Sequence, residues 1–235
     1  MIVGLHEMKQ FSTKIIILGR INYGEADRIL NVITPDHGKL SLLAKGVRRS
    51  KSKLAGGLEL FSISNVTFID GKSEIKTVIS TQLDRYFSKI VENIESTKLA
   101  YDFLKKIDKY TKESCDEQYF NLLISGLESL HIHDKNTEII NVWFLSQLLK
   151  LHGSAINVDT TANKLPFDEN SNYEFNYDEM AFFARKDGRF EPKHIKFLRL
   201  LLKVNSPENL INIEGSQDIA VRLKGLLDNC YRLEY

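Results

Sequence analysis

The spacing of apolar residues changes once along this chain of 235 residues, near residue 85, and the change divides it into two structural types. Before that point, apolar residues alternate with polar ones or form short β-branched runs, which is typical of strands. After it, they recur every three or four residues, which indicates amphipathic helices. We therefore expect an α+β chain with two domains, residues 1–83 and residues 84–235.

Five short strands are predicted in the first domain, and turn residues separate them. They cover residues 14–20, 29–34, 40–44, 61–69 and 74–81. Asp70 and Gly71 form a favoured two-residue hairpin turn between the last two strands. A basic stretch and the glycine pair Gly56 and Gly57 join the third strand to the fourth. This pattern favours a small five-stranded barrel such as an OB-fold, and an open sheet packed against the rest of the chain is the alternative.

The second domain is predicted to be helical around one irregular insertion. Its apolar stripes begin at Phe87, Leu99, Tyr119, Ile139, Ile195 and Ile219. Residues 156–192 are instead polar and rich in Asn, Asp, Phe and Tyr, with a turn signal at Asp187 and Gly188. We expect this stretch to form a small irregular subdomain inserted among the helices.

Composition excludes several classes of protein. With 43% hydrophobic and 27% charged residues, the chain has enough apolar material for a core and is not a disordered protein. Its apolar runs are far shorter than the roughly 20 residues needed to cross a bilayer, and its N-terminus is polar, so we expect neither a membrane partner nor a signal peptide. Cys115 and Cys230 are too few for a disulfide framework or a zinc ligand set, which favours a reduced, cytoplasmic protein.

Charge is distributed unevenly although the net charge is only +1. Residues 1–83 contain twelve lysines and arginines against seven acids, a net charge of +5, which leaves −4 for the rest of the chain. Five of these cations lie within residues 45–53, a stretch without an acid. Such an asymmetry suggests that the first domain meets an anion and that the acidic helical domain meets proteins.

Candidate catalytic residues are weak by comparison. His131 and His133 follow a helical stripe, and a helix C-terminus favours histidine electrostatically. Glu25 and Asp27 flank Arg28 at a strand boundary, which favours a surface ion pair over a catalytic carboxylate pair. Because no nucleophile, metal set or acid–base pair stands out, we expect a protein that is not an enzyme.

The basic stretch is the strongest candidate for a functional site, and we interpret it as a loop that meets an anion. A solvated loop without a function is the alternative. The candidate site residues are the five cations of the stretch, three flanking cations and one aromatic residue that could stack on a base: Lys45, Arg48, Arg49, Lys51, Lys53, Arg20, Arg28, Lys39 and Tyr23.

Three motifs in this region resemble the N-terminal signature of the RecO family of bacterial DNA-repair proteins. They are residues 22–29 (NYGEADRI), 34–39 (TPDHGK) and 44–58 (AKGVRRSKSKLAGGL). The resemblance implies an N-terminal OB-fold, a helical C-terminal domain, and annealing of complementary strands. It also implies binding of single- and double-stranded DNA, for which we predict that the candidate site residues named above are the DNA-binding residues. It also implies partnership with RecR and with the C-terminal tail of the single-strand-binding protein, so that RecA is loaded onto DNA at the nucleoid.

The chain departs from that family in its inserted subdomain. Many members hold zinc there with two CxxC pairs, but residues 156–192 contain no cysteine, so we expect no zinc and no other cofactor. Packing must then stabilise this degenerate zinc-type subdomain. The aromatic residues available for it are Phe167, Tyr173, Phe175, Tyr177, Phe182 and Phe183.

Two other functions remain open from the sequence. The first is a protein–protein adaptor in which the barrel binds protein and the cations only steer assembly. The second is a nuclease or other hydrolase, which the missing metal or nucleophile set disfavours.

Overall fold

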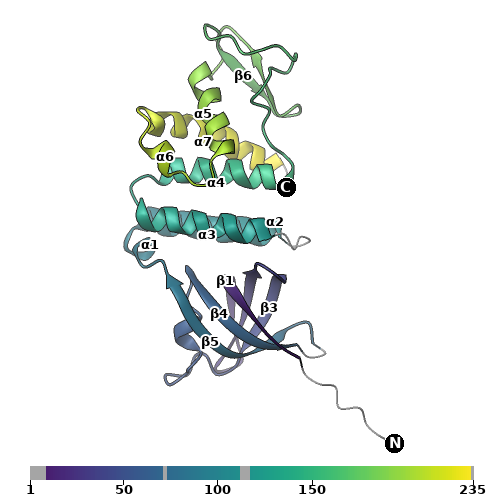
Figure 1. Ribbon diagram of the computed structural model, residues 1–235, viewed down its shortest axis with the longest axis vertical. Helices are drawn as coiled ribbons and strands as arrows, with labels where there is room; N and C mark the ends of the chain where they lie inside the picture. The colour runs from purple at the N-terminus through teal and green to yellow at the C-terminus, as the bar shows by residue number, and fades with distance from the viewer. Residues whose placement is uncertain (1–8, 71–72, 112–116, 234–235) are drawn as a thin grey trace, which may run out of the picture. The chain divides into compact units, whose positions relative to one another are not determined.

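Figure 1 shows a computed structural model of the chain, which describes residues 9–70, 73–111 and 117–233. Contacts within the chain define two compact units, Met1–Leu127 and Glu128–Tyr235. The predicted boundary at residues 83 and 84 falls within the last strand of the first unit, which runs to Tyr86, and the first helices belong to the same unit as the strands. Gly71 of the predicted hairpin turn and Cys115 lie outside the described residues.

The first unit begins with five strands that close into a barrel. They are β1 (Lys9–Tyr23), β2 (Asp27–Thr34), β3 (Gly38–Ala44), β4 (Ser62–Asp70) and β5 (Lys76–Tyr86). Their hydrogen-bonded order is β1-β2-β3-β5-β4, and β4 pairs with β1 to complete the ring. All pairs are antiparallel except β3 with β5, which is parallel and joins Leu42 to Lys76 and Leu43 to Thr77.

Alternate residues of the strands fill the barrel interior, as a period of two requires. The buried cluster includes Ile15, Ile17, Leu30, Val32, Leu42, Ala44, Val66, Phe68 and Val78. The prediction of five N-terminal strands in an α+β chain is confirmed. Four of the five strands are longer than predicted, and β1 is so because polar residues also pair across it: the Ser12 and Thr67 hydroxyls lie 2.9 Å apart, between the N-terminal part of β1 and β4.

The predicted helix starting at Phe87 is wrong in extent. A single turn, α1 (Lys89–Glu92), precedes the longer α2 (Ile94–Tyr110). Asn93 between them has extended backbone angles, and its Oδ1 accepts hydrogen bonds from the amides of Glu95 and Ser96 at 2.9 and 3.1 Å. Asn93 therefore caps α2 and ends α1, because an N-cap residue lies outside the helix that it starts.

The second unit is mainly helical. α3 (Glu117–Ile132) crosses the boundary between the units, and α4 (Thr137–His152), α5 (Pro192–Lys203), the short α6 (Glu208–Ile211) and α7 (Ser216–Leu233) follow. α4 is buried on almost every side and packs against α5 and α7. Trp143 of α4 is buried, and its indole Nε1 donates to the Val204 carbonyl at 3.1 Å, just after α5. The helices predicted from the later apolar stripes are thus confirmed.

The insertion between α4 and α5 is more regular than the sequence suggested. It contains an antiparallel pair, β6 (Tyr173–Asn176) and β7 (Ala181–Ala184). Phe182 is fully buried, and its ring contacts those of Phe167, Phe175 and Phe190, with centroids 4.9–6.3 Å apart. An aromatic cluster therefore forms the core of this subdomain.

Neither a metal site nor a membrane span is found in the part of the chain that the structure describes. Its His, Cys, Asp and Glu residues nowhere form a group of three that could hold a metal ion. None of its helices combines the length and the apolar character needed to cross a bilayer.

Candidate nucleic-acid interface

The predicted DNA-binding stretch is a loop, residues 45–53, that leaves β3 and leads to the short 3-10 helix Ala55–Gly57. We call it the basic loop. Val47 within it is only 6% exposed and belongs to the barrel core, together with Leu58 beyond the 3-10 helix. The loop is therefore anchored by apolar contacts near both ends.

Hydrogen bonds fasten the start of the basic loop to the turn between β1 and β2. The Gly46 amide donates to Asp27 Oδ1 at 2.7 Å, and the Arg48 amide donates to the Ala26 carbonyl at 2.9 Å. Gly46 has a φ of +65°, a conformation that glycine adopts without strain. Asp27 thus positions the loop, which is a different role from the surface ion pair that the sequence suggested.

The five cations of the basic loop are exposed and have no acidic partner in the described part of the chain. No ion pair within the described residues involves Lys45, Arg48, Arg49, Lys51 or Lys53. Arg48 makes one weak contact, from its guanidinium Nη1 to the Gly24 carbonyl at 3.5 Å. Other cations of the same unit are paired, such as Lys14 with Asp84 at 3.0 Å. The concentration of unpaired positive charge is therefore a particular property of this loop.

Strand pairing places Arg28 next to the basic loop and Arg20 further along the sheet. Arg28 is paired with Ala44, the residue before the loop, and its Nε donates to Asn22 Oδ1 at 3.1 Å. Arg20 is paired with the buried Leu30, and its guanidinium lies 4.0 Å from the Glu59 carboxylate. Both side chains share the inner side of the sheet, because directly paired residues lie on the same face.

Tyr23 is exposed at the end of β1, as a base-stacking residue must be, with 55% of its surface accessible. The sequence analysis missed Ile21, which lies two residues earlier on the same face and is 62% exposed. Alternation along β1 could have identified it, because an apolar residue at an outward position is unusual next to a charged loop.

Lys39 does not join this group. Its ammonium forms an ion pair with the Asp108 carboxylate and donates to the Asp108 carbonyl at 3.2 Å. Asp108 belongs to α2, so Lys39 ties β3 to the helix that follows the barrel. The sequence placed Lys39 beside the basic loop because it could not show a partner 69 residues away.

The predicted interpretation of the two histidines agrees with the fold. His131 lies in the last turn of α3, and His133 follows the helix end, where its amide donates to the Ser129 carbonyl at 2.8 Å.

The cations of the basic loop at the end of the barrel can bind phosphate groups through their flexible side chains. Among the described residues, no group of side chains could hold a metal ion that would bind phosphate instead.

The fold and the loop define the class: an α+β protein whose N-terminal barrel carries a cation-rich, firmly attached loop. Residues 8–87 match the family described as "Recombination protein O N terminal". This region of the chain is therefore similar to the N-terminal domain of that family, as its sequence motifs suggested.

Curated proteins named "DNA repair protein RecO" are similar over a longer part of the chain. The protein from Dehalococcoides mccartyi is 36% identical over 154 residues, which cover 65% of this chain and 60% of that protein. The protein from Desulfatibacillum aliphaticivorans is 32% identical over 155 residues, with coverage of 65% and 60%. The protein from Rubrobacter xylanophilus is 30% identical over 155 residues, with coverage of 66% and 62%. The match therefore spans about three fifths of the length of these relatives.

Proposed function

We propose that this protein is a DNA-binding recombination mediator of DNA repair, and that its barrel is an OB-fold used for that purpose. The observation that carries the proposal is the basic loop, with five exposed cations that have no acidic partner within the described residues. Unpaired cations on an anchored loop suit a phosphate backbone, because they exchange condensed counterions for phosphates without first breaking internal ion pairs.

The proposed activity is annealing of complementary strands without chemical turnover. Cations that neutralise phosphates allow two strands to approach and test base pairing. Phosphate contacts do not depend on sequence, so single- and double-stranded DNA are both expected ligands. Tyr23 and Ile21 offer a flat, exposed surface beside the loop against which an unpaired base can pack.

The partners proposed for this activity come from the family. They are RecR and the C-terminal tail of the single-strand-binding protein, with RecA loaded as the result and the nucleoid as the place of action. The names of the relatives support DNA repair as the general process.

A salt titration of binding to a single-stranded oligonucleotide tests the proposal. Five loop contacts predict a slope of log affinity against log salt near −3.5, at about 0.7 per contact. The double variant Arg48→Ala/Arg49→Ala should flatten the slope by roughly 1.4 and weaken binding to all sequences alike. The matched control replaces two cations of α2, Lys98→Ala/Lys105→Ala, and should leave the slope unchanged.

The alternative function is a protein adaptor, and the exposed apolar pair of Ile21 and Tyr23 favours it. An adaptor would bind the oligonucleotide weakly, and the Arg48→Ala/Arg49→Ala variant would behave on DNA like the wild type. That result would exclude the basic loop as the DNA site.

A further inference from the structure

The second unit contains a basic segment that contrasts with its acidic surroundings. Residues 185–203 hold seven lysines and arginines against two acids, a net charge of +5. The other residues of the unit hold six cations against fourteen acids. The negative charge of the C-terminal half therefore conceals one positive region, which includes the whole of α5.

The lysines of α5 lie on one face of the helix. Lys193, Lys196 and Lys203 are exposed and are spaced three and seven residues apart, which places them along a single stripe about 15 Å long. The opposite face is buried through Ile195, Leu198 and other apolar residues. α5 contains no acid, and we call its exposed stripe the lysine stripe.

The ion pairs that involve the lysine stripe are exposed and replaceable. Lys193 lies 3.0 Å from Glu191, and Lys196 lies 2.7 Å from Glu169, with side chains 52–78% accessible in both pairs. Such pairs contribute little to stability, so a ligand phosphate can displace the carboxylates. Lys203 has no ion pair among the described residues. The ammonium of Lys150 in α4 donates a hydrogen bond of 2.9 Å to the carbonyl of Leu202, the residue before Lys203.

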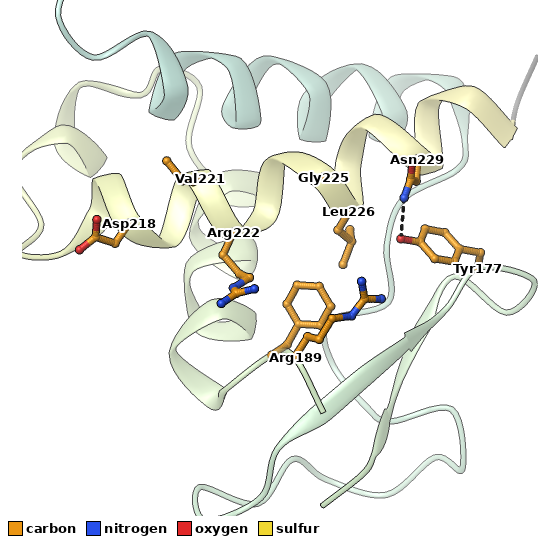
Figure 2. Close-up of a pocket in the computed structure, with 9 residues that line it drawn as sticks. Tyr177, Arg189, Asp218, Val221, Arg222, Gly225, Leu226 and Asn229 are labelled. Carbon is orange, nitrogen blue, oxygen red and sulfur yellow. Dashed lines mark hydrogen bonds between the residues drawn. The ribbon is translucent and has the colours of Figure 1, made fainter. Parts of the chain in front are cut away.

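A cavity of about 540 Å³ adjoins the start of α5 (Figure 2). The Arg189 side chain reaches it from the segment between β7 and α5, and the Arg222 side chain from α7. Arg222 has no ion pair among the described residues. Arg189 is held by Glu174, with Nη2 2.6 Å from the carboxylate. Phe190 in the cavity wall is only 3% exposed, so it presents no ring face on which a base could stack.

We propose that the lysine stripe is a second binding surface for single-stranded DNA, which contacts the phosphate backbone and not the bases. The inference rests on the proposed function, because it assigns the first strand to the basic loop and the second to α5. One chain then holds two strands at two separate surfaces, which is the arrangement that annealing requires. Because this second contact is with phosphates, it is independent of sequence.

The test counts bound oligonucleotides on the full chain by sedimentation, with thymidine oligonucleotides of about ten residues. We expect two per wild-type chain, and a second binding step with a salt slope near −2 from three lysines. The variant Lys193→Gln/Lys196→Gln/Lys203→Gln should bind one. Arg48→Ala/Arg49→Ala should bind at the lysine stripe as the wild type does, and more weakly at the basic loop, with the salt slope of that step flattened by roughly 1.4. Both variants should anneal complementary strands more slowly than the wild type.

The matched control replaces three exposed cations elsewhere in the same unit, Lys135→Gln/Lys164→Gln/Arg232→Gln, and should bind two oligonucleotides. Thermal melting checks that each variant is folded. If the stripe variant matches this control while Arg48→Ala/Arg49→Ala loses binding, the inference is wrong and the proposed function stands. If the wild type binds no oligonucleotide, both are wrong. Loss of binding to a polyglutamate peptide with DNA binding intact would make the stripe a protein site and overturn the inference.

Discussion

The Oδ1 atom of Asp27 accepts a hydrogen bond of 2.7 Å from the backbone amide of Gly46, and so joins the β1–β2 turn to the first residues of the basic loop. Replacing Asp27 by alanine leaves that amide without its acceptor and should lower the free energy of unfolding by about 1–2 kcal/mol. The salt slope of DNA binding should stay the same, because no cation is removed, while the affinity falls as the loop loses its position.

Glu25→Ala is the matched control, since it removes the same charge from the same turn. Any gain in DNA affinity from the lost negative charge should appear in both variants. A Glu25→Ala protein that loses as much stability as Asp27→Ala would show that charge, and not the hydrogen bond, explains the effect.

Lys39→Ala should destabilise the protein without changing its salt slope on DNA. The change removes the ion pair between β3 and α2 and leaves Asp108, whose side chain is 35% exposed, without its cation. We expect a loss of about 1–2 kcal/mol by chemical denaturation. A slope flattened by about 0.7 would instead place Lys39 on a phosphate, as the sequence alone suggested.

The aromatic cluster should carry the stability of the inserted subdomain. Phe182→Ala removes a fully buried ring and should lower the free energy of unfolding by about 3–5 kcal/mol. Phe183→Ala, at the neighbouring half-buried position of β7, should lower it much less.

A metal chelator should leave the melting temperature of the wild type unchanged, because the inserted subdomain has no cysteines with which to hold zinc. One tightly bound zinc per chain, found by elemental analysis, would contradict this prediction.

Acid should weaken the contact between β6 and the segment before α5. The hydrogen bond from Arg189 lowers the pKa of Glu174, whose side chain is only 12% exposed. A lowered pKa in the folded state gives stability that is present above the unfolded pKa of about 4.3 and is lost as the pH falls through the folded value. Glu174→Gln should therefore show a shallower loss of stability than the wild type below about pH 5 in acid titrations.

Glu169→Gln is the comparison for this experiment. Lys196 also lowers the pKa of Glu169, but that carboxylate is 78% exposed, and solvent screens the pair. Its acid titration should follow the wild type closely. Equal effects of the two variants would mean that burial of Glu174 is unimportant.

Local patterns were sufficient to predict the order of the five barrel strands and of the longer helices. Val66 and Val78 alternate with less buried neighbours, and the stripe from Ile219 to Cys230 matches the buried face of α7, because burial on one face imposes these periods. The break at Asn93 was also a local signal, since an asparagine before Ile94 and Glu95 is a favoured helix cap. The apolar stripe that begins at Phe87 continues past Asn93 to Ile94, and so indicated a helix without a break at this point.

Long-range contacts account for what the sequence could not show at the candidate site. The clustering of cations is a property of composition and was visible directly. The partner that removes Lys39 from the cluster and the amide that binds Asp27 depend on how distant segments meet. The lysine stripe on α5 was hidden for a different reason, because the net charge of the second half averages its positive helix with acidic neighbours.

Val47 has a consequence for the thermodynamics of ligand binding. Its side chain enters the barrel core when the protein folds, so the backbone on both sides of it gives up its conformational freedom at that stage. A disordered cationic tail would lose that freedom only on meeting DNA, and its affinity would be lower by the same amount. The basic loop instead meets its ligand already ordered, and only the long side chains of its lysines and arginines have entropy left to lose.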